Sequence, residues 1–516
     1  MDLPSRHQVH STRQEKPTGQ LHWRPVSMRN PFLAVLATLL VTISQFASQA
    51  NAADKPNVVL MLADNVGYGD VGAYGGGEMR GMPTPVLDQL AAEGMQLTQF
   101  LVEPGCTPSR AALMTGRYSV RSGLGTIILG GLPNTLQDEE FTLGEMFKSV
   151  GYSTALIGKW HLGFEEQSWP TRQGFDEYKV GVIETSESTL YRPNMERAGI
   201  DEETIRQAVP HIFESDADGN LARVREYTTE YRRQIEGDIA SASVDYIKRK
   251  AAASEPFFLY VGWTHTHYPN LTAPEFTGKS SHRYGDAMME LDHRTGQVLE
   301  AIKQAGIEDN TIVLWMSDNG ASPDAAPWPD KGGSNAPFRG ELGDPMEGSI
   351  RTVGMIKWPG KIRQGKTNEM VAIHDIMPTL ASIIGADLPD DRPYDGVDQS
   401  PFFLGQQETS NREHLLTHIN NEVAALRWRH FRIYPKAYTG SPSNPSQEGM
   451  LGIQIEKNGG PDVFNIEMDT REEYPISGDN AWVVANWLRL VAEYNRTLRE
   501  HPNPPGVTLT DPDFGK

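Results

Sequence analysis

The chain has one cysteine, Cys106, among its 516 residues, so no disulfide can form within it. Packing or chemistry must explain this residue, and a small buried hydrophobic role is the usual explanation for a lone cysteine. An excess of positive charge is also missing, because the formal net charge is −20 at pH 7. This balance argues against a nucleic-acid partner, and it means that an anionic substrate needs a local positive site.

Long hydrophobic runs are equally scarce. Residues 32–43 are mostly apolar, but this run is too short to span a bilayer and instead suits the core of a signal peptide. Arg29 precedes the run, Met28 is the expected initiator, and residues 50–52 read Ala-Asn-Ala, a typical cleavage site. We therefore expect residues 1–52 to be a signal region, the protein to be periplasmic or secreted, and no stable membrane span. The alternative is a buried helix of a folded domain.

The residues that follow Cys106 favour chemistry over packing. Residues 106–117 read Cys-Thr-Pro-Ser-Arg-Ala-Ala-Leu-Met-Thr-Gly-Arg, and Pro108 with Ser109 suits the opening of a helix. Cys106 would then lie at a helix N-terminus, where free backbone N–H groups attract an anion. Arg110, one turn later, adds a planar guanidinium that matches a tetrahedral oxyanion.

Short apolar runs alternate with helix-like segments over the first two-thirds of the chain. The pattern predicts strands at residues 57–63, 153–157, 256–262 and 311–316, and helices at residues 85–94, 143–151 and 283–306. This alternation predicts an α/β fold with a mostly parallel sheet and helices on both faces. Polar residues follow several of these strands, and the carboxyl ends of strands are where open α/β sheets bind ligands.

The C-terminal part of the chain has a different pattern. Residues 414–434 read as hairpin-like strands, and residues 482–498 carry apolar side chains at helical spacing. Residues 438–449 are rich in Pro, Ser and Gly, which predicts a loop. A boundary between two parts of the chain is therefore expected near residue 400.

The run at residues 106–116 resembles the signature Cys-x-Pro-Ser-Arg-x-x-x-x-Thr-Gly of the type I, arylsulfatase-like sulfatases in the alkaline phosphatase superfamily. In that family a maturation enzyme oxidises the cysteine to formylglycine, whose hydrate attacks the sulfur of a sulfate ester. The resemblance implies a sulfuric ester hydrolase that cleaves an aryl, carbohydrate or alkyl sulfate monoester through a covalent formylglycine-sulfate intermediate. It also implies a catalytic domain at residues 53–400 and, at residues 401–516, a smaller α+β subdomain with an antiparallel sheet and a packed helix.

Oxygen-bearing side chains follow two of the predicted strands. Asp64 ends the first strand, and Asp318 and Asn319 end a later one. Alone, such residues are usually turn or cap residues, but together with the Cys106 run they match the family's metal site in order and context. The resemblance implies Ca²⁺, with Mg²⁺ as the alternative, and the implied ligands are Asp64, Asn65, Cys106, Asp318 and Asn319. The family usually has a second aspartate where this chain has Asn65, whose amide oxygen can coordinate but adds no charge.

The sequence Gly-Lys-Trp-His-Leu-Gly at residues 158–163 matches a second run of the same family. By this match Lys159 binds a sulfate oxygen and the leaving-group side of the ester. His161 steadies the formylglycine diol and takes the proton that breaks the intermediate. Alone, these residues would be a solvated lysine and a hydrogen-bonded core histidine. Arg110 and the metal would hold and polarise the sulfate group.

Two histidines occur in Thr-His-Thr-His-Tyr-Pro at residues 264–269. The family places a general acid for the leaving alcohol in this run, and the position before Tyr-Pro favours His267, with His265 as the alternative. Two histidines on one side of an extended segment could also indicate zinc, but no further His or Cys ligands can be assigned.

A second departure from the family lies near residues 347–351, which read Glu-Gly-Ser-Ile-Arg. Many family members have a substrate-binding lysine five residues before this run, where the present chain has Leu342. Arg339 or Lys331 could supply the missing charge, and we assign Arg339 to substrate binding. This departure predicts a divergent subfamily with altered substrate or leaving-group demands.

Two alternatives to a sulfatase remain open at this point. One is a phosphonate or phosphate ester hydrolase of the same superfamily. The other is an inactive protein that binds sulfated ligands, which Asn65 and Leu342 motivate, although the unbroken run at residues 106–116 argues against it. The expected partners are a sulfate-ester small molecule or sulfated sugar and a formylglycine-generating or other sulfatase-maturing enzyme.

Overall fold

The computed structural model describes most of the chain after residue 54. The described residues are 55–130, 133–322, 332–438, 454–455 and 460–506. Lys55–Lys516 form one compact unit, so the division into two domains near residue 400 stays a prediction. The expected signal region, most of the loop predicted at residues 438–449, and Lys331 lie outside the described residues. Among the helices that the structure describes, none combines the length and apolar character needed to cross a membrane.

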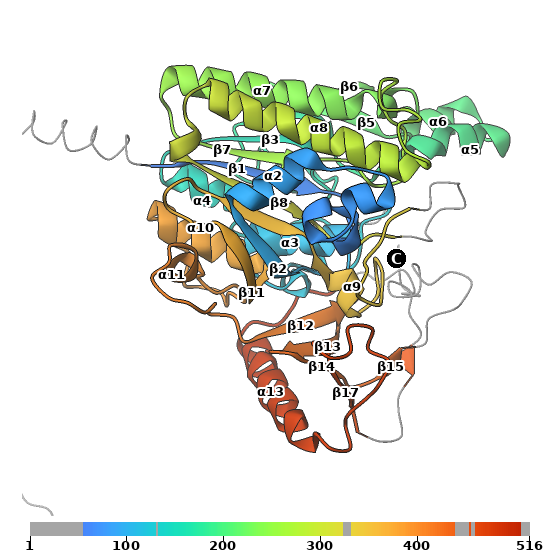
Figure 1. Ribbon diagram of the computed structural model, residues 1–516. Helices are drawn as coiled ribbons and strands as arrows, with labels where there is room; N and C mark the ends of the chain where they lie inside the picture. The colour runs from blue at the N-terminus through green and yellow to red at the C-terminus, as the bar shows by residue number, and fades with distance from the viewer. Residues whose placement is uncertain (1–54, 131–132, 323–331, 439–453, 456–459, 507–516) are drawn as a thin grey trace, which may run out of the picture. The chain divides into compact units, whose positions relative to one another are not determined.

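A large mixed sheet forms the centre of this unit (Figure 1). Its strands run in the order β11-β2-β10-β8-β1-β7-β3-β4-β5-β6, with the short strand β9 paired to β2. The strands are β1 (Asn57–Ala63), β2 (Met95–Leu101), β3 (Ser153–Lys159), β4 (Glu177–Val182), β5 (His211–Ser215), β6 (Leu221–Glu226), β7 (Phe257–Gly262), β8 (Thr311–Ser317), β9 (Arg351–Thr352), β10 (Gly354–Lys357) and β11 (Gly365–Ala372). The central strands from β8 to β4 are parallel, while β10, β5 and β6 pair antiparallel with their neighbours.

Helices cover both faces of this sheet, as the alternation of the sequence predicted. The helices are α2 (Pro85–Glu93), α3 (Cys106–Thr115), α4 (Leu143–Ser149), α5 (Tyr191–Arg197), α6 (Glu202–Ala208), α7 (Ile235–Ala253), α8 (Arg283–Gln304), α9 (Glu347–Ile350), α10 (Ile376–Ile384), α11 (Ser400–Phe403) and α13 (Val484–Glu500). Successive residues of a strand face opposite sides of a sheet. Leu60 of β1 therefore joins the core under α3, α4 and α10, while its neighbour Met61 joins the core under α2, α7 and α8.

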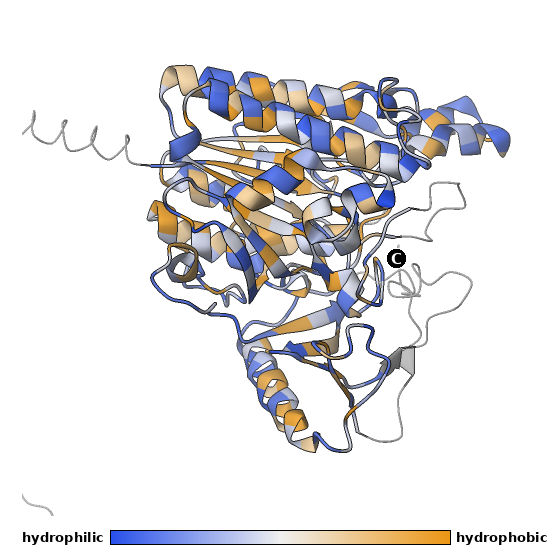
Figure 2. Cartoon of the chain, in the orientation of Figure 1, coloured by the Kyte–Doolittle hydropathy of each residue, from blue (hydrophilic) through white to orange (hydrophobic). Residues whose placement is uncertain are grey.

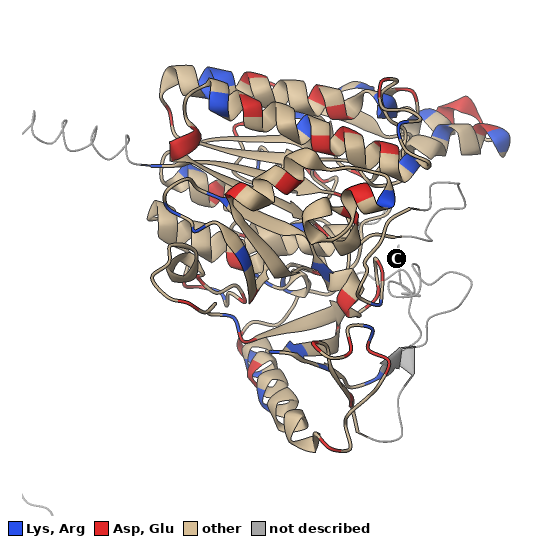
Figure 3. Ribbon diagram, in the orientation of Figure 1, with Lys and Arg blue, Asp and Glu red and all other residues tan. Residues whose placement is uncertain are grey.

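The distribution of side chains follows from these two cores. The central strands are largely apolar, whereas α7 and α8 are apolar on one side and polar on the other (Figure 2). Charged residues gather on the helices and loops, and few lie on the central strands (Figure 3). This is the pattern of a sheet that is buried on both faces.

A separate antiparallel sheet follows, as expected for the C-terminal part. It consists of β12 (His414–Ile419), β13 (Glu422–Trp428), β14 (Phe431–Tyr434) and β17 (Asp462–Asn465). The helix α13 packs on it through Leu490 and Tyr494. A further pair of short strands, β15 (Ala437–Tyr438) and β16 (Gln454–Ile455), completes the described strands. The predicted α/β fold with a smaller antiparallel sheet and a packed helix is therefore confirmed.

Several elements escaped the sequence analysis. The helix α7 buries Ala240 and Ser243 among its larger residues, and such small side chains blur the apolar period on which helix prediction relies. The strands β4, β5 and β6 extend the sheet at one edge, and β6 is largely exposed, so it lacks the apolar run of a buried strand.

Substitution of Leu60 by alanine should destabilise the fold strongly. The side chain of Leu60 is 0% exposed in the centre of the sheet, whereas that of Leu488 on α13 is 64% exposed. Leu60→Ala should lower the free energy of unfolding by about 2–5 kcal/mol, because a cavity remains in a closely packed core. The matched Leu488→Ala control should cost less than about 0.5 kcal/mol. Chemical denaturation monitored by circular dichroism measures both, and equal losses would contradict this description of the core.

Candidate active site

Two acidic residues lie side by side because their strands are neighbours. Ala63 ends β1 in register with Ser317, which ends β8, so Asp64 and Asp318 leave the sheet at the same edge. The main-chain N–H of Asp318 donates to the carbonyl oxygen of Ala63 at 3.1 Å, and Asp318 Oδ1 accepts from the main-chain N–H of Asn65 at 3.0 Å. Both carboxylates are fully buried.

Each of these carboxylates is paired with a buried cation. Lys159 Nζ lies 2.6 Å from Asp64 Oδ2, and Arg110 Nη2 lies 2.8 Å from Asp318 Oδ2. Burial is the largest single influence and would raise the pKa of the Asp64 carboxyl, but the positive charges around it, that of Lys159 first, together outweigh burial and hold that pKa well below its usual range. Burial, reinforced by the neighbouring charge of Asp64, raises the pKa of Asp318.

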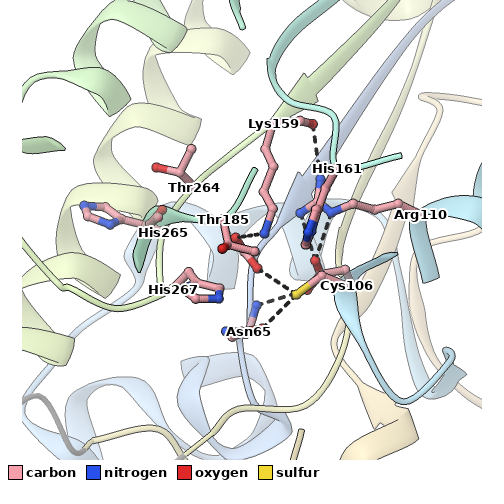
Figure 4. Close-up of polar contacts among 12 residues, drawn as sticks. Asn65, Cys106, Arg110, Lys159, His161, Thr185, Thr264, His265 and His267 are labelled. Carbon is pink, nitrogen blue, oxygen red and sulfur yellow. Dashed lines mark hydrogen bonds and ion pairs between the residues drawn. The ribbon is translucent and has the colours of Figure 1, made fainter. Parts of the chain in front are cut away.

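Cys106 begins α3, as the prediction of a helix N-terminus required, and its side chain lies close to Asn65 (Figure 4). Its Sγ lies 3.4 Å from Asp64 Oδ1 and 3.5 Å from Asn65 Oδ1. Burial, and next the charge of Asp318, raises the pKa of the Cys106 thiol well above its ordinary value. The unmodified thiol is therefore protonated and acts as a weak hydrogen-bond donor to these oxygens.

His161 follows β3 and enters the same cluster with a positive φ of 63°. Its Nε2 lies 2.8 Å from the carbonyl oxygen of Ile128, whereas its Nδ1 is buried without a hydrogen-bond partner among the described residues. Burial, and next the charge of Lys159, lowers the pKa of His161 well below its ordinary value. The ring is therefore neutral, donates from Nε2, and keeps a lone pair on Nδ1 that can accept a proton.

His267 and His265 turn away from each other (Figure 4). The ring of His267 comes within 4.8 Å of a carboxylate oxygen of Asp64 and of Cys106 Sγ. The ring of His265 instead lies between Arg232 Nη2 at 2.8 Å and Glu290 Oε2 at 3.2 Å. This arrangement favours His267 over His265 as the residue that meets a substrate at Cys106.

Comparison with known proteins identifies the family to which this cluster belongs. A family model described as "Sulfatase" matches residues 56–386. The steryl-sulfatase of Rattus norvegicus is 31% identical over 91% of this chain and 94% of that protein. The N-acetylgalactosamine-6-sulfatase of Canis lupus familiaris is 33% identical over 92% of both proteins. The crystal structure of the PsFucS1 sulfatase from Pseudoalteromonas sp. superposes with a TM-score of 0.82 at 32% identity, covering 89% of this chain and 93% of that one.

The chain belongs to the sulfatase family. The resemblance found at residues 106–116 is confirmed, and so is the expectation that the protein is a sulfatase and an enzyme.

The sulfatase gathers oxygen atoms at this edge that suit a hard divalent cation. The carboxylates of Asp64 and Asp318 are joined by the amides of Asn65 and Asn319. Asn319 Nδ2 donates to Asn65 Oδ1 at 2.7 Å. The other amide atom, Asn319 Oδ1, is buried and has no hydrogen-bond partner among the described residues. An uncompensated buried oxygen is costly, so this donor set fits a metal ion. Asp64, Cys106 and His267 also lie close enough to share an ion.

Arg339 is not brought into this cluster by any contact that the structure records. Its side chain is exposed, and Arg339 Nη1 donates to the main-chain oxygen of Glu472 at 3.2 Å. Leu342 is 9% exposed and its main-chain N–H donates to the carbonyl oxygen of Ala321. The assignment of Arg339 to substrate binding stays a prediction. The hydrogen bond to Glu472 joins Arg339 to the main chain of another segment and does not involve the Cys106 cluster.

Two residues of the site were missed by sequence reasoning. Tyr260 on β7 lies behind the cluster, where its hydroxyl is 3.3 Å from Arg110 Nη1. A tyrosine within the apolar run of a buried strand was a signal that could have found it. Glu187 lies 3.4 Å from His267 Nδ1, but it belongs to no motif, and only the fold brings the two together.

Proposed function

We propose that this sulfatase hydrolyses a sulfate monoester of a sugar at the Cys106 cluster, after Cys106 has been matured to formylglycine. The observation that carries the proposal is the position of the chain's one cysteine. It lies buried at the start of α3, within reach of Asp64 and Asn65, in a cluster that also holds two paired cations and two histidines. Formylglycine at this position, once hydrated, would carry two hydroxyl groups. One would attack the sulfur, and loss of the proton from the other would release the sulfate, a route that a serine or cysteine nucleophile lacks.

The charges of the cluster suit an anionic ester. Lys159 balances Asp64 and Arg110 balances Asp318, so the four side chains are together neutral. Ca²⁺, or Mg²⁺, held by the Asp64, Asn65, Asp318 and Asn319 side chains would supply positive charge at the sulfate oxygens. A local positive site would then exist inside a chain whose net charge is −20.

Four side chains would handle the sulfate and the protons. Arg110 presents a planar guanidinium, and Lys159 a point charge, to the sulfate oxygens. His267 would protonate the alcohol oxygen as its bond to sulfur breaks, so that the alcohol leaves neutral. His161, whose Nδ1 is without a partner among the described residues, would accept the proton that must be removed when sulfate is released.

A sugar is favoured as the alcohol half because of the cavity at the end of β4. This cavity has a volume of about 490 Å³, which lies within the usual range for small-molecule sites. Val182 in its wall is in register with Lys159. Aromatic rings of Phe164, Tyr191 and Tyr227 and the polar side chain of Gln207 line it, and this mixture suits a ring with both apolar faces and hydroxyl groups.

The relatives support two kinds of alcohol, as their names state. One is an N-acetylgalactosamine-6-sulfatase and the other a steryl-sulfatase.

We also propose that the protein is exported after removal of residues 1–52 and that a formylglycine-generating or other sulfatase-maturing enzyme converts Cys106. The order of Arg29, the apolar run and the small residues at 50–52 supports export.

The function is tested by activity and mass together. Protein from a host that matures sulfatases should show loss of the thiol and gain of an aldehyde in the tryptic peptide that contains residue 106. It should hydrolyse N-acetylgalactosamine 6-sulfate with a higher kcat/KM than a steryl sulfate, 4-nitrophenyl phosphate or a phosphonate monoester. Cys106→Ala should lose turnover by roughly 10⁴-fold or more, because no other nucleophile is in place. Full activity with an unmodified Cys106, or a preference for the phosphate, would contradict the proposal.

A second test concerns the metal. Asn65→Asp would add a negative charge beside Asp64 and Asp318, so it should tighten Ca²⁺ binding by roughly tenfold or more, which is about 1.4 kcal/mol per factor of ten. The Asn310→Asp control adds the same charge at an exposed position and should leave the affinity unchanged. Calorimetric titration of the metal-free proteins measures this, and equal or weaker binding in Asn65→Asp would show that Asn65 does not ligate the ion.

A further inference from the structure

Arg223 is an arginine in the wall of the sugar cavity that no neighbouring acid neutralises. It lies on β6, the last strand of the large sheet, and lines the cavity of about 490 Å³ at the end of β4. The residue is exposed, and no hydrogen bond or ion pair within the described part of the chain involves its guanidinium. In a chain with a net charge of −20, such a guanidinium is available to an anionic ligand.

The charge of Arg223 also acts inside the cavity. His211 on β5 lines the same cavity and is half-buried. Burial, and next the charge of Arg223, lowers the pKa of His211. The ring is therefore neutral near pH 7 and can donate one hydrogen bond beside the guanidinium. This part of the cavity offers a positive charge and a second donor to an oxyanion.

The part of the cavity nearer the Cys106 cluster has the opposite charge. Glu184 lines it, and Glu184 Oε2 is buried without a hydrogen-bond partner among the described residues. Glu187, in the next turn of the chain, lies 3.4 Å from His267 Nδ1, and Glu165, four residues after His161, also lines the cavity. These carboxylates can accept hydrogen bonds from sugar hydroxyl groups, but they repel a further anionic group.

The register of the sheet shows how far Arg223 lies from the cluster. Lys159 of β3 pairs with Val182 of β4. One residue back on β4, Gly181 pairs with Phe213 of β5, and Phe213 in turn pairs with Arg223 of β6. Three strand spacings of about 4.8 Å therefore separate β3 from β6, about 14 Å in all across the sheet. This distance exceeds the width of one sugar ring, so an anionic group at Arg223 belongs to the next sugar along a chain.

We propose that Arg223 is a specificity-determining residue that binds an anionic group on the second sugar of the substrate. The sulfate ester of the first sugar lies at Cys106, and hydroxyl groups of that sugar meet Glu184. A carboxylate or a second sulfate on the neighbouring sugar accepts hydrogen bonds from the guanidinium of Arg223. This inference rests on the proposed function and narrows its substrate class to an oligosaccharide with anionic groups on successive sugars.

The test is Arg223→Gln, assayed with matured protein on three disaccharides. In each of them N-acetylgalactosamine 6-sulfate is joined to a second sugar, which is glucose, glucuronic acid or glucose 6-sulfate. The three differ at one carbon of the second sugar, which carries a hydroxyl group, a carboxylate or a sulfate. Chromatography of the products measures desulfation of the N-acetylgalactosamine unit.

The unsubstituted protein should have a KM roughly 5–50-fold lower for at least one anionic disaccharide than for the glucose disaccharide, because a charge-assisted hydrogen bond to Arg223 adds binding energy. Arg223→Gln should abolish this advantage and change the KM for the glucose disaccharide by less than about threefold. Loss of the advantage for glucuronic acid, for glucose 6-sulfate or for both supports the inference and identifies the anion that Arg223 binds.

Arg225 offers a matched control on the same strand. It is exposed, lies over the ring of Tyr231 at 4.5 Å, and is outside the lining of the cavity. Arg225→Gln removes the same charge from the protein and should keep the preference for an anionic second sugar. Thermal unfolding followed by circular dichroism should give Arg223→Gln the melting temperature of the unsubstituted protein, because the side chain has no partner to lose among the described residues.

The inference is overturned if Arg223→Gln keeps the preference, if both variants lose it equally, or if the unsubstituted protein has the same KM for all three disaccharides. Failure of the proposed function is distinct, since the unsubstituted protein would then desulfate neither the disaccharides nor N-acetylgalactosamine 6-sulfate itself.

Discussion

The structure depends on two carboxylates that are buried side by side. Asp64 and Asp318 leave adjacent parallel strands at one edge of the sheet, and both are fully buried. Such charges are costly to bury unless they are paired. Lys159 and Arg110 supply the pairing at 2.6 and 2.8 Å. The end of β3 and the first turn of α3 must therefore meet this edge, and the start of α3 brings Cys106 with it.

The same constraint explains how an acidic protein can handle an anionic ester. Under the proposed function, a divalent cation on the oxygen atoms of the Asp and Asn side chains would make the neutral cluster positive, while the rest of the surface would keep its negative charge. The buried oxygen of Asn319, which lacks a partner among the described residues, is consistent with that use. On the proposed ligand set, an asparagine at position 65 in place of a second aspartate would weaken the attraction for a metal ion without removing an oxygen ligand.

The sheet and most residues of the site could be predicted from the sequence, whereas contacts between distant segments could not. Apolar runs gave β1 and β8, and the parallel sheet that they imply places Asp64 and Asp318 together. The resemblance at residue 106 indicated the chemistry. Contacts that depend on distant segments were beyond reach: Arg339 contacts the main chain of Glu472, and Glu187 meets His267 only because β4 and β7 end at the same edge. Neither the spacing of residues in the sequence nor its composition predicts such contacts between distant segments.

The most direct measurement is a crystal structure of the Cys106→Ala variant grown with Ca²⁺ and N-acetylgalactosamine 6-sulfate. This variant lacks the nucleophile, so the ester should remain intact. The account requires the sulfate group to lie beside residue 106, with oxygens on Arg110 and Lys159 and the ester oxygen facing His267 Nε2. Binding of the sulfate group anywhere else, or an ester oxygen turned away from His267, would contradict it.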